Sequence, residues 1–268
     1  MYLKNIRNSI PSDKNQIVDF CKNTFSWGDY INQVWDSWEK DEGLVIIEDD
    51  KTAIAMCHGV KYQNEKMLWI KGIRVKENYR KNGIATRFIR YFEKIAIDSG
   101  IKHVNMLIET ENISSLNLAK KLEYKIISEW NYFSLPSKNN SHRKIKFESI
   151  DINELNFKGM RFVDSWRWIP LTKDNFENLY SSGNVLCQKN DGVVQSLGII
   201  SESNSFDDTI ILTIIFGVCD DIHKMIWYTQ NLSVEKGHSK IRILTEKDDL
   251  KMDSLGNKFP FYLVEKTL

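Results

Sequence analysis

The chain has 268 residues, which is long for one compact domain and sufficient for two of modest size. Hydrophobic residues make up 42% of it, and the formal net charge is only +1. This balance gives no global electrostatic reason to expect a nucleic-acid partner or an anionic membrane. Because the sequence has no run of about 18 apolar residues and no apolar signal core at its N-terminus, it predicts a soluble, cytoplasmic protein.

The cysteines are scattered along the chain, at Cys21, Cys57, Cys187 and Cys219. They form no CxxC pair and the histidines do not cluster, so the pattern argues against a zinc site and against a disulfide framework. We therefore expect no bound metal. Buried free thiols in a reducing compartment are the simplest interpretation.

The first half alternates strand-like and helix-like stretches. Residues 2–7 resemble a short strand, and Ser12 or Asp13 can begin a helix that runs through Cys21. A three-stranded meander, a long amphipathic helix, a strand, a second helix and a last strand follow. In chain order these are 44–48, 53–60, 67–75, 83–99, 103–108, 114–122 and 126–135. This alternation predicts a layered α/β domain.

A polar, turn-rich stretch at 136–141 marks the predicted domain boundary. It separates a first domain, residues 1–138, from a second, residues 145–268. The second half has a hairpin, a long apolar strand, a helix and a further strand in the same order as the first half. The ranges are 185–189, 193–201, 209–218, 222–236 and 240–245, with a closing strand at 259–263. The repeated order predicts tandem copies of one fold.

The segment from Arg80 to Ala85 joins a polar turn to the start of the long helix. The first backbone N–H groups of a helix have no partner within it and, with the positive end of the helix dipole, they suit a diphosphate. Arg80 and Lys81 add positive charge, and Gly83 lets phosphate oxygens approach the backbone. The segment is neither a Walker loop nor a dinucleotide fingerprint. By itself it fits an ordinary strand-to-helix turn equally well.

Two longer motifs favour the phosphate interpretation. Gly72-Ile73-Arg74-Val75, the turn, Arg80-x-x-Gly83-x-Ala85 and the helix resemble the acetyl-CoA motif of the GNAT superfamily of acyl-CoA-dependent N-acyltransferases. Downstream, Asn112-x-x-Ser115-x-x-Leu118-x-x-Lys121-Leu122-x-Tyr124 resembles the second motif of the same superfamily. The resemblance covers residues 2–135.

The resemblance implies an α/β (α+β) chain of two tandem acetyltransferase-like domains, each a mixed central sheet flanked by helices. In the first, the sheet is splayed between the strands ending at Val75 and near Ile108, and the pantetheine arm of acetyl-CoA enters the gap. The implied cofactor-binding residues are Ile73, Arg74, Val75, Arg80, Lys81, Asn82, Gly83, Ile84, Ala85, Thr86, Asn112 and Ser115. The second domain carries Asp220 and Asp221 where phosphates need positive charge, so we interpret it as a degenerate copy.

The implied reaction is attack of a neutral primary amine on the thioester, which needs a base for the amine proton and a donor for the leaving thiolate. Glu109, just after a strand that borders the gap, is the predicted base, although a solvated strand-end carboxylate describes it equally well. Glu111 and His58 are weaker candidates. Many members of the superfamily carry a tyrosine seven residues after the second-motif asparagine. This chain has Ala119 there, so no proton donor is assigned.

The segment after the first predicted strand is rich in aromatic residues and is expected to determine the acceptor amine. Trp27, Asp29 and Tyr30 are predicted to bind the substrate, whereas Trp35 and Trp38 are predicted to be core residues of a helix. Gly28-Asp29-Tyr30, Trp38 and Gly72-Ile73-Arg74-Val75 also resemble a subgroup that contains the vertebrate histidine N-acetyltransferase. That resemblance implies a small amino-acid acceptor, with Asp29 contacting its amine.

Two functions fit these residues. The first is an N-acetyltransferase that uses acetyl-CoA and acts on a primary amine of a small molecule, amino acid or peptide. The second is a catalytically weak acyl-CoA-binding pseudo-enzyme that acts as a sensor or protein-interaction module. The sequence favours the first function, and Ala119 and the degenerate second copy are the features that keep the second open as an alternative. No feature of the sequence points to a particular oligomeric state.

Overall fold

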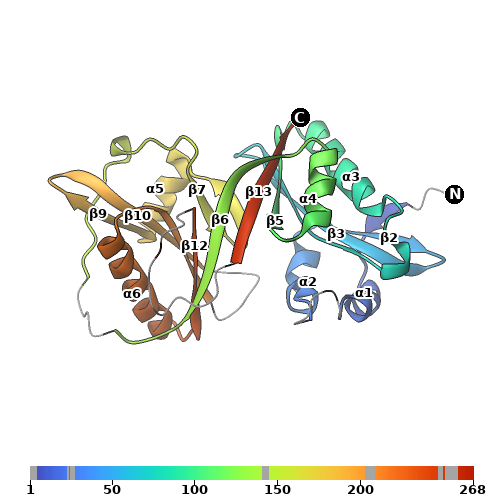
Figure 1. Cartoon of the computed structure of the whole chain (residues 1–268), viewed down its shortest axis with the longest axis horizontal. Coiled ribbons are helices and arrows are strands. Elements are labelled where there is room, and N and C mark those ends of the chain that lie inside the picture. The colour runs from blue at the N-terminus through green and yellow to red at the C-terminus, as the bar shows by residue number, and fades with distance from the viewer. Residues whose placement is uncertain are drawn as a thin grey trace. The chain divides into compact units, whose positions relative to one another are not determined.

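The structure is a computed structural model, and it describes residues 5–22, 24, 28–140, 145–202, 209–246, 250 and 259–268. These residues form two compact units. The first unit contains the described chain up to Ile127 together with Leu263–Leu268, and the second contains the described part of Ser128–Tyr262. Within each unit, helices pack on a β-sheet (Figure 1). The expected mixed α/β architecture is therefore confirmed.

The first unit is built on a mixed sheet with strand order β1-β2-β3-β4-β5. The strands are β1 (Ile6–Asn8), β2 (Leu44–Asp49), β3 (Thr52–Tyr62), β4 (Met67–Val75) and β5 (His103–Glu109). Neighbouring strands are antiparallel from β1 to β4, and β5 runs parallel to β4. A parallel step requires a crossover connection, which the helix between β4 and β5 provides.

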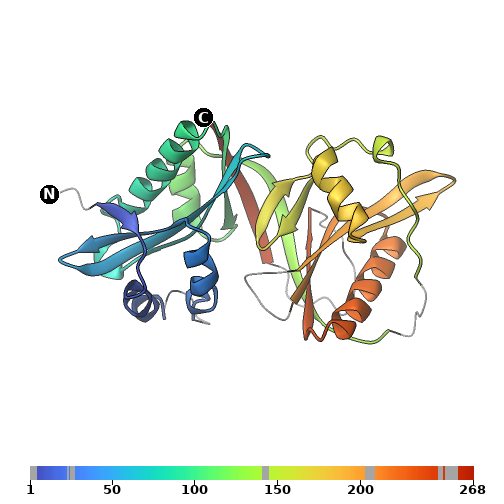
Figure 2. The same ribbon diagram turned by 180° about the vertical axis from the view of Figure 1, so that it is seen from behind.

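Helices cover both faces of this sheet (Figures 1 and 2). They are α1 (Asp13–Cys21), α2 (Ile31–Lys40), α3 (Ile84–Asp98) and α4 (Ile113–Lys121). Consecutive residues of a strand point to opposite faces. In β3, His58 stacks on Trp38 of α2, whereas a Cβ at Gly59 would lie 2.2 Å from a ring carbon of Phe92 in α3. Helices α2 and α3 therefore pack on opposite faces of β3.

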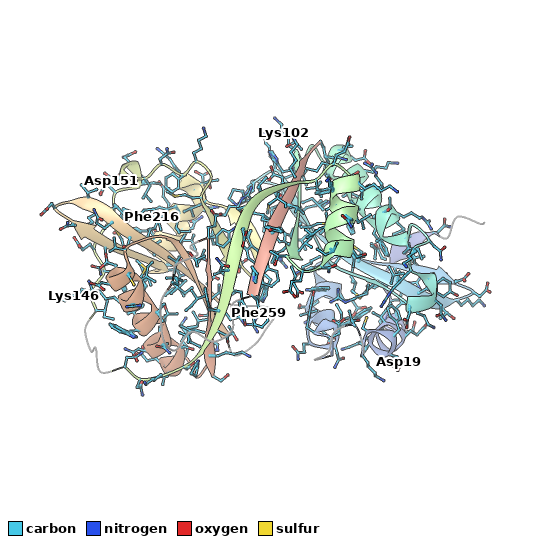
Figure 3. The ribbon with its side chains drawn as sticks, in the orientation of Figure 1. Asp19, Lys102, Lys146, Asp151, Phe216 and Phe259 are labelled. Atoms are coloured by element: carbon cyan, nitrogen blue, oxygen red, sulfur yellow. The ribbon has the colours of Figure 1, made fainter. Side chains whose placement is uncertain are left out.

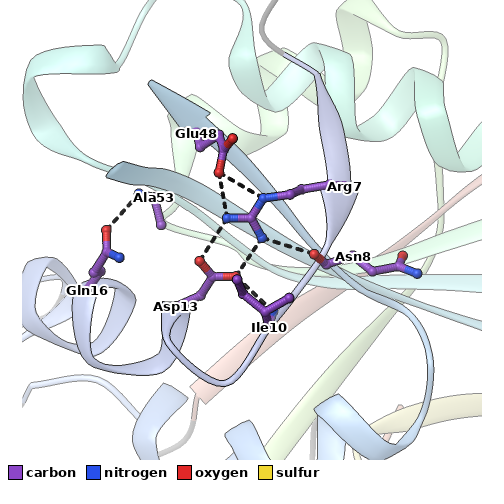
Figure 4. Close-up of polar contacts among 7 residues, drawn as sticks. All are labelled: Arg7, Asn8, Ile10, Asp13, Gln16, Glu48 and Ala53. Atoms are coloured by element: carbon purple, nitrogen blue, oxygen red, sulfur yellow. Dashed lines mark hydrogen bonds and ion pairs between the residues drawn. The ribbon is translucent and has the colours of Figure 1, made fainter. Parts of the chain in front are cut away.

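A network of polar contacts fixes α1 to the edge of the sheet (Figure 4). Arg7 of β1 donates through Nη1 and Nη2 to the two carboxylate oxygens of Asp13, at 2.7 and 2.9 Å, and through Nε to Glu48 at 2.8 Å. Asp13 also accepts the Ile10 N–H at 2.9 Å. The hydrogen bond to Asp13, followed by that to Glu48, raises the pKa of Arg7 in spite of burial. Because the contact to Asp13 is bidentate, it fixes both position and orientation.

The first unit is completed by the end of the chain. The last strand, β13 (Phe259–Thr267), ends beside β5. Glu265 contacts the His103 ring nitrogen Nδ1 at 3.1 Å and accepts a hydrogen bond from Asn105 at 3.0 Å. The Leu268 N–H donates to the carbonyl of Lys102, which Figure 3 labels, at 2.9 Å. Residues more than 150 positions apart thus share one sheet.

The second unit repeats the centre of the first, with strand order β6-β12-β11-β10-β9. The strands are β6 (Lys125–Pro136), β9 (Val185–Asn190), β10 (Val193–Glu202), β11 (Thr209–Phe216) and β12 (Lys240–Thr245). From β9 to β11 neighbours are antiparallel, and β12 runs parallel to β11, as β5 does to β4. β6, which comes from the first half of the sequence, pairs antiparallel with β12.

Helix α6 (Cys219–Glu235) is the crossover of the second unit and packs on β10, β11 and β12. The opposite face carries a small hairpin of β7 (Arg161–Asp164) and β8 (Arg167–Pro170), followed by α5 (Lys173–Ser181). The Val163 N–H of β7 donates to the Thr213 hydroxyl of β11 at 3.0 Å, which joins the hairpin to the sheet. None of the helices in the described ranges combines the length and the apolar character needed to cross a membrane.

The predicted elements between residues 44 and 135 are all present, with ends within two residues of their predicted positions. The hairpin of β7 and β8 and helix α5 were not predicted, because their segments are short and alternate weakly. Helix α6 begins at Cys219 instead of residue 222. The compact units also differ from the predicted ranges 1–138 and 145–268, since their division falls within β6 and Leu263–Leu268 return to the first unit.

Candidate functional site

The sheet of the first unit opens between β4 and β5. The two strands pair at Met67↔His103, Leu68↔Val104 and Trp69↔Asn105. Beyond these pairs β4 runs on to Val75 and β5 to Glu109, and no further pair joins the described residues of the two strands. One backbone edge of residues 70–75 therefore faces a gap instead of a neighbouring strand. The predicted splay between these two strands is confirmed.

A β-bulge lies in β4 beside this gap. Between its pairs to His58 and Met56 of β3, strand β4 contains one extra residue. Gly72 in this stretch has a φ of +64°, the left-handed conformation of the first residue in a glycine bulge. A Cβ at Gly72 would also lie 2.4 Å from Cζ3 of Trp38 in α2. Only glycine satisfies both the backbone conformation and the close approach of the helix.

The loop after β4 leads into α3 through the 3-10 turn Glu77–Tyr79. Lys81 and Gly83 have φ values of +63° and +74°, so the chain passes twice through the left-handed region before the helix begins. The Arg80 side chain donates from Nε to the Val75 carbonyl at 3.1 Å and ties the loop to the end of β4. This loop is the segment that the sequence predicts to bind a diphosphate.

The start of α3 presents a run of backbone donors. The N–H groups of residues 81–86 have no acceptor among the described residues, and the Arg87 N–H is the first to bond, to the Gly83 carbonyl at 3.1 Å. The first turn of α3 contains no acidic side chain, and, among the described residues other than Gly83 and its two chain neighbours, no heavy atom lies within 4 Å of a Cβ placed on Gly83. Open donors at the positive end of a helix dipole are suited to phosphate oxygens. The loop therefore offers the donors and the positive dipole end that a diphosphate group needs.

The second motif forms the start of α4. Asn112 is the N-cap of this helix, and its side chain accepts the Ser115 N–H at 3.1 Å. Ala119 is buried. Helix α4 therefore has no side-chain hydroxyl at the position where the sequence resemblance implies a tyrosine. Tyr124 follows the helix and is also buried, and this burial raises the pKa of its phenol.

The candidate bases differ sharply in environment. Glu109 is the last residue of β5 and is exposed, and its carbonyl accepts the Asn112 N–H at 2.9 Å. It thus lies on the strand that borders the gap. Glu111 is exposed in the turn that follows. His58 is fully buried and stacks on Trp38 with ring centroids 4.6 Å apart, which favours a structural role.

The predicted acceptor-binding residues lie before α2. Trp27 is outside the described residues. The Asp29 carboxylate binds the Arg74 guanidinium of β4, with Nε–Oδ2 and Nη2–Oδ1 distances of 2.7 and 3.2 Å, and also accepts the Ile31 N–H at 3.1 Å. Arg74 lies over the Tyr30 ring, 5.3 Å from its centroid. Asp29 is therefore already engaged by a cation of the protein.

Burial sets the protonation of this group. It raises the pKa of the Tyr30 phenol, so that the phenol stays neutral. Burial opposes the charge of Arg74, but interactions with Tyr30 and Asp29 outweigh it and raise the Arg74 pKa. The predicted core residues Trp35 and Trp38 are buried. Local sequence patterns do not predict the contact of Arg74 with Asp29, although a charged residue in a mostly apolar strand signals that a partner is needed.

The corresponding place in the second unit is closed. β12 pairs with β11 along its whole length, from Thr209↔Lys240 to Ile214↔Thr245, and β11 continues only to Phe216, so no gap like that between β4 and β5 opens between these strands. At the start of α6 the Ser196 hydroxyl accepts the Val218 N–H at 3.1 Å and donates to Asp221 at 3.0 Å. Asp220 and Asp221 supply negative charge in the first turn. Among the described residues, this junction therefore lacks both the strand gap and the acid-free helix start that are found in the first unit.

The chain shares its fold with many solved structures, of which three illustrate the likeness. A proposed acetyltransferase from Thermoplasma acidophilum has a TM-score of 0.65 at 13% identity, covering 98% of this chain and 100% of its own. A GCN5-related N-acetyltransferase from Sphaerobacter thermophilus has a TM-score of 0.66 at 13% identity, covering 98% and 95%. A proposed acetyltransferase from Pyrococcus horikoshii has a TM-score of 0.61 at 14% identity, covering 100% and 91%. The likeness in fold extends over both units.

Comparison with curated proteins finds no match to the chain. A family model does match the sequence. The matched region contains the gap between β4 and β5, the loop of residues 80–85 and the start of α4 at Asn112. Its description is acetyltransferase (GNAT) family, and it matches residues 14–124. Residues 14–124 therefore match the GNAT acetyltransferase family as a domain within the chain.

Proposed function

We propose that the first unit binds acetyl-CoA and transfers its acetyl group to a primary amine of a small molecule, amino acid or peptide. The observation that carries the proposal is the gap between β4 and β5 next to a run of open backbone donors at the start of α3. The backbone of Ile73 to Val75 is assigned to the pantetheine arm and the N–H groups of residues 81–86 to the diphosphate. Asn112 and Ser115 are assigned to the same cofactor at the start of α4.

In the proposed reaction the amine nitrogen attacks the thioester carbon. A carbon–nitrogen bond forms, the carbon–sulfur bond breaks, and the sulfur leaves as a thiol once it has gained a proton. Glu109 is assigned as the base that accepts the amine proton, directly or through a water molecule. Its place at the end of β5 and its exposure support this role.

The pKa of the acceptor amine determines the free energy that its deprotonation requires. A lysine-type amine with a pKa of about 10.4 needs roughly 4.6 kcal/mol for deprotonation at neutral pH, whereas an α-amino group with a pKa of about 8 needs far less. We therefore expect α-amino acceptors to react faster than lysine side chains.

Calorimetric titration with acetyl-CoA and a thiol-release assay with a panel of amines test the proposal. Arg80→Glu and Gly83→Trp should abolish saturable binding, because they reverse a charge and fill the space beside the donors. Gly100→Trp is the matched control. Gly100 lies just after the other end of α3, with a φ of +68° and no atom within 4 Å of a built Cβ. Unchanged affinity in the Gly83 variant would refute the assigned cofactor site.

A second function is favoured by Ala119, which removes the usual tyrosine from α4. It is an acyl-CoA-binding pseudo-enzyme that acts as a sensor or protein-interaction module. The same two measurements separate the functions. Saturable binding of acetyl-CoA with release of thiol on at least one amine supports the enzyme. Binding without turnover on any amine of the panel supports the pseudo-enzyme.

A further inference from the structure

Two cations of β4 lie against two aromatic rings of the segment 29–38, one on each side of the bulge at Gly72. Lys71 Nζ is 4.6 Å from the centroid of the Trp38 ring, and Arg74 Cζ is 5.3 Å from the centroid of the Tyr30 ring. The two rings meet edge to face, with their centroids 6.1 Å apart. Contacts of a cation with an aromatic face are attractive, and more so away from water. One short segment therefore holds β4 on both sides of its bulge.

The ion pair of Asp29 with Arg74 fixes the orientation of β4 against this segment. The side chains are 3% and 12% exposed, and the two hydrogen bonds between them measure 2.7 and 3.2 Å. A guanidinium bound by both oxygens of a carboxylate is fixed in orientation as well as in distance. Because Asp29 also accepts the Ile31 N–H, the same carboxylate fixes the start of α2.

The strand held in this way is the strand that borders the gap. Arg74 also donates from Nη1 to the Ile73 carbonyl, at 3.2 Å. Ile73 to Val75 is the stretch whose backbone is assigned to the pantetheine arm. Small errors in position are costly at a reacting centre, since a shift of about 1 Å can lower the rate about a hundredfold.

We infer that Asp29 is a positioning residue for acetyl-CoA: through Arg74 it fixes the backbone of Ile73 to Val75 at the gap. The inference rests on the proposed function of the gap. It gives Asp29 a role different from the amine contact that the sequence suggests. It also joins the segment before α2, where the acceptor is expected, to the cofactor strand through one ion pair.

The first unit contains a matched control for this ion pair. Arg7 binds Asp13 at 2.7 and 2.9 Å, and the Asp13 side chain is 2% exposed. Asp13 is the first residue of α1, and Asp29 lies just before α2. Each aspartate also accepts a hydrogen bond from a backbone N–H. The Arg7 pair joins α1 to β1 and β2, which β3 separates from the strands of the gap. The two pairs thus share their chemistry and differ in their distance from the gap.

The test compares Asp29→Asn with Asp13→Asn in the full chain. Asparagine keeps the shape and can still accept the backbone N–H, but it lacks the negative charge. The readouts are the melting temperature, the Kd of acetyl-CoA by calorimetry, and kcat and KM for acetyl-CoA in the thiol-release assay. We expect both variants to lose thermal stability. Only Asp29→Asn should weaken acetyl-CoA binding or lower kcat by about tenfold or more, because only it loosens the cofactor strand.

Arg74→Lys and Arg7→Lys form a second matched pair if either asparagine variant fails to fold. Lysine keeps the positive charge but loses the fork that binds both carboxylate oxygens. A specific loss of acetyl-CoA affinity or kcat in Asp29→Asn or Arg74→Lys supports the inference. Equal Kd and kcat in the gap variants and their controls, measured on folded protein, would overturn it. Failure of the wild-type chain to bind acetyl-CoA would instead overturn the proposed function, and the inference with it.

Discussion

At the scale of single residues, Gly72 is the position where backbone conformation and packing coincide. Its φ is +64°, and a Cβ there would lie 2.4 Å from Cζ3 of Trp38. Gly72→Ala should therefore lower the free energy of unfolding by about 3 kcal/mol, from the left-handed conformation and from the clash together. Denaturant titration provides the measurement.

Gly100→Ala separates the two contributions to that loss. Gly100 has a φ of +68°, but no heavy atom of the described residues, its own and its two chain neighbours' aside, lies within 4 Å of a Cβ built on it. The expected cost is about 1 kcal/mol, from conformation alone. If both variants lost the same amount of stability, Trp38 would have to move aside without cost, and the close packing of α2 on the bulge would be disproved.

The cysteines give a second prediction at this scale. Burial raises the pKa of Cys21 to about 12 and that of Cys187 to about 11, and it raises the pKa of Cys57 as well, whereas Cys219 is exposed. The thiolate is the reactive form, so a thiol reagent near pH 8 should modify one cysteine per native chain. Cys219→Ser should abolish this reaction, and full denaturation should expose the remaining thiols. Rapid modification of a second thiol in the native chain would contradict the burial.

The same shifts set the pH dependence of stability. A buried thiol with a raised pKa keeps its proton in the folded chain, whereas an exposed thiol loses it near a pKa of about 8.5. The contribution of these buried thiols to the free energy of unfolding is therefore fully present below about pH 8.5. It is lost as the pH rises through the raised pKa values of Cys187 and Cys21.

At the scale of elements, the two units differ at equivalent strands. β4 and β5 separate after Trp69 and Asn105, while β11 and β12 stay paired to Ile214 and Thr245. The start of α6 is also occupied by Ser196 and by acidic side chains. We therefore expect one acetyl-CoA per chain in a calorimetric titration.

The stoichiometry has a direct control. In Gly83→Trp, which changes only the first unit, binding should disappear altogether instead of falling by half. A stoichiometry of two in the wild type, or half-occupancy in this variant, would mean that the second unit also holds the cofactor.

At the scale of the whole molecule, the first unit depends on the last residues of the chain. Leu263 and Val264 are buried, Glu265 binds Asn105, and Lys266 binds Glu93 of α3 at 3.2 Å. A chain that ends at residue 262 should therefore lose acetyl-CoA binding and become sensitive to proteolysis in its first half. A fragment of residues 1–138 should fail for the same reason.

Removal of Leu268 alone is the control for this truncation. It deletes one backbone hydrogen bond, from the Leu268 N–H to the Lys102 carbonyl, and leaves the buried residues in place. We expect the melting temperature and acetyl-CoA binding of this variant to stay close to those of the full chain. A stable fragment 1–138 that binds acetyl-CoA would show that the final strand is dispensable.

The elements that rest on local patterns can be predicted from the sequence. The apolar spacing in α3 predicts a helix, and the alternation in the strands predicts a sheet. Gly83, which precedes α3, predicts the loop of residues 80–85. All three depend only on neighbours within a few residues. The resemblance in the loop and in the Asn112 turn also identified the family that residues 14–124 match. Asp220 and Asp221 also indicated that the second copy differs from the first, because they put negative charge at the start of its crossover helix.

The tertiary structure alone decided how distant segments meet. Asp29 and Arg74 lie 45 positions apart, and His103 and Glu265 lie 162 apart, so no local pattern could pair them. The same holds for the return of the final strand to the first unit, because Glu265 lies 160 and 162 positions after the β5 residues that it contacts. Periodicity states which face of a strand is buried but not which strand it will join, and that choice is made by packing across the whole chain.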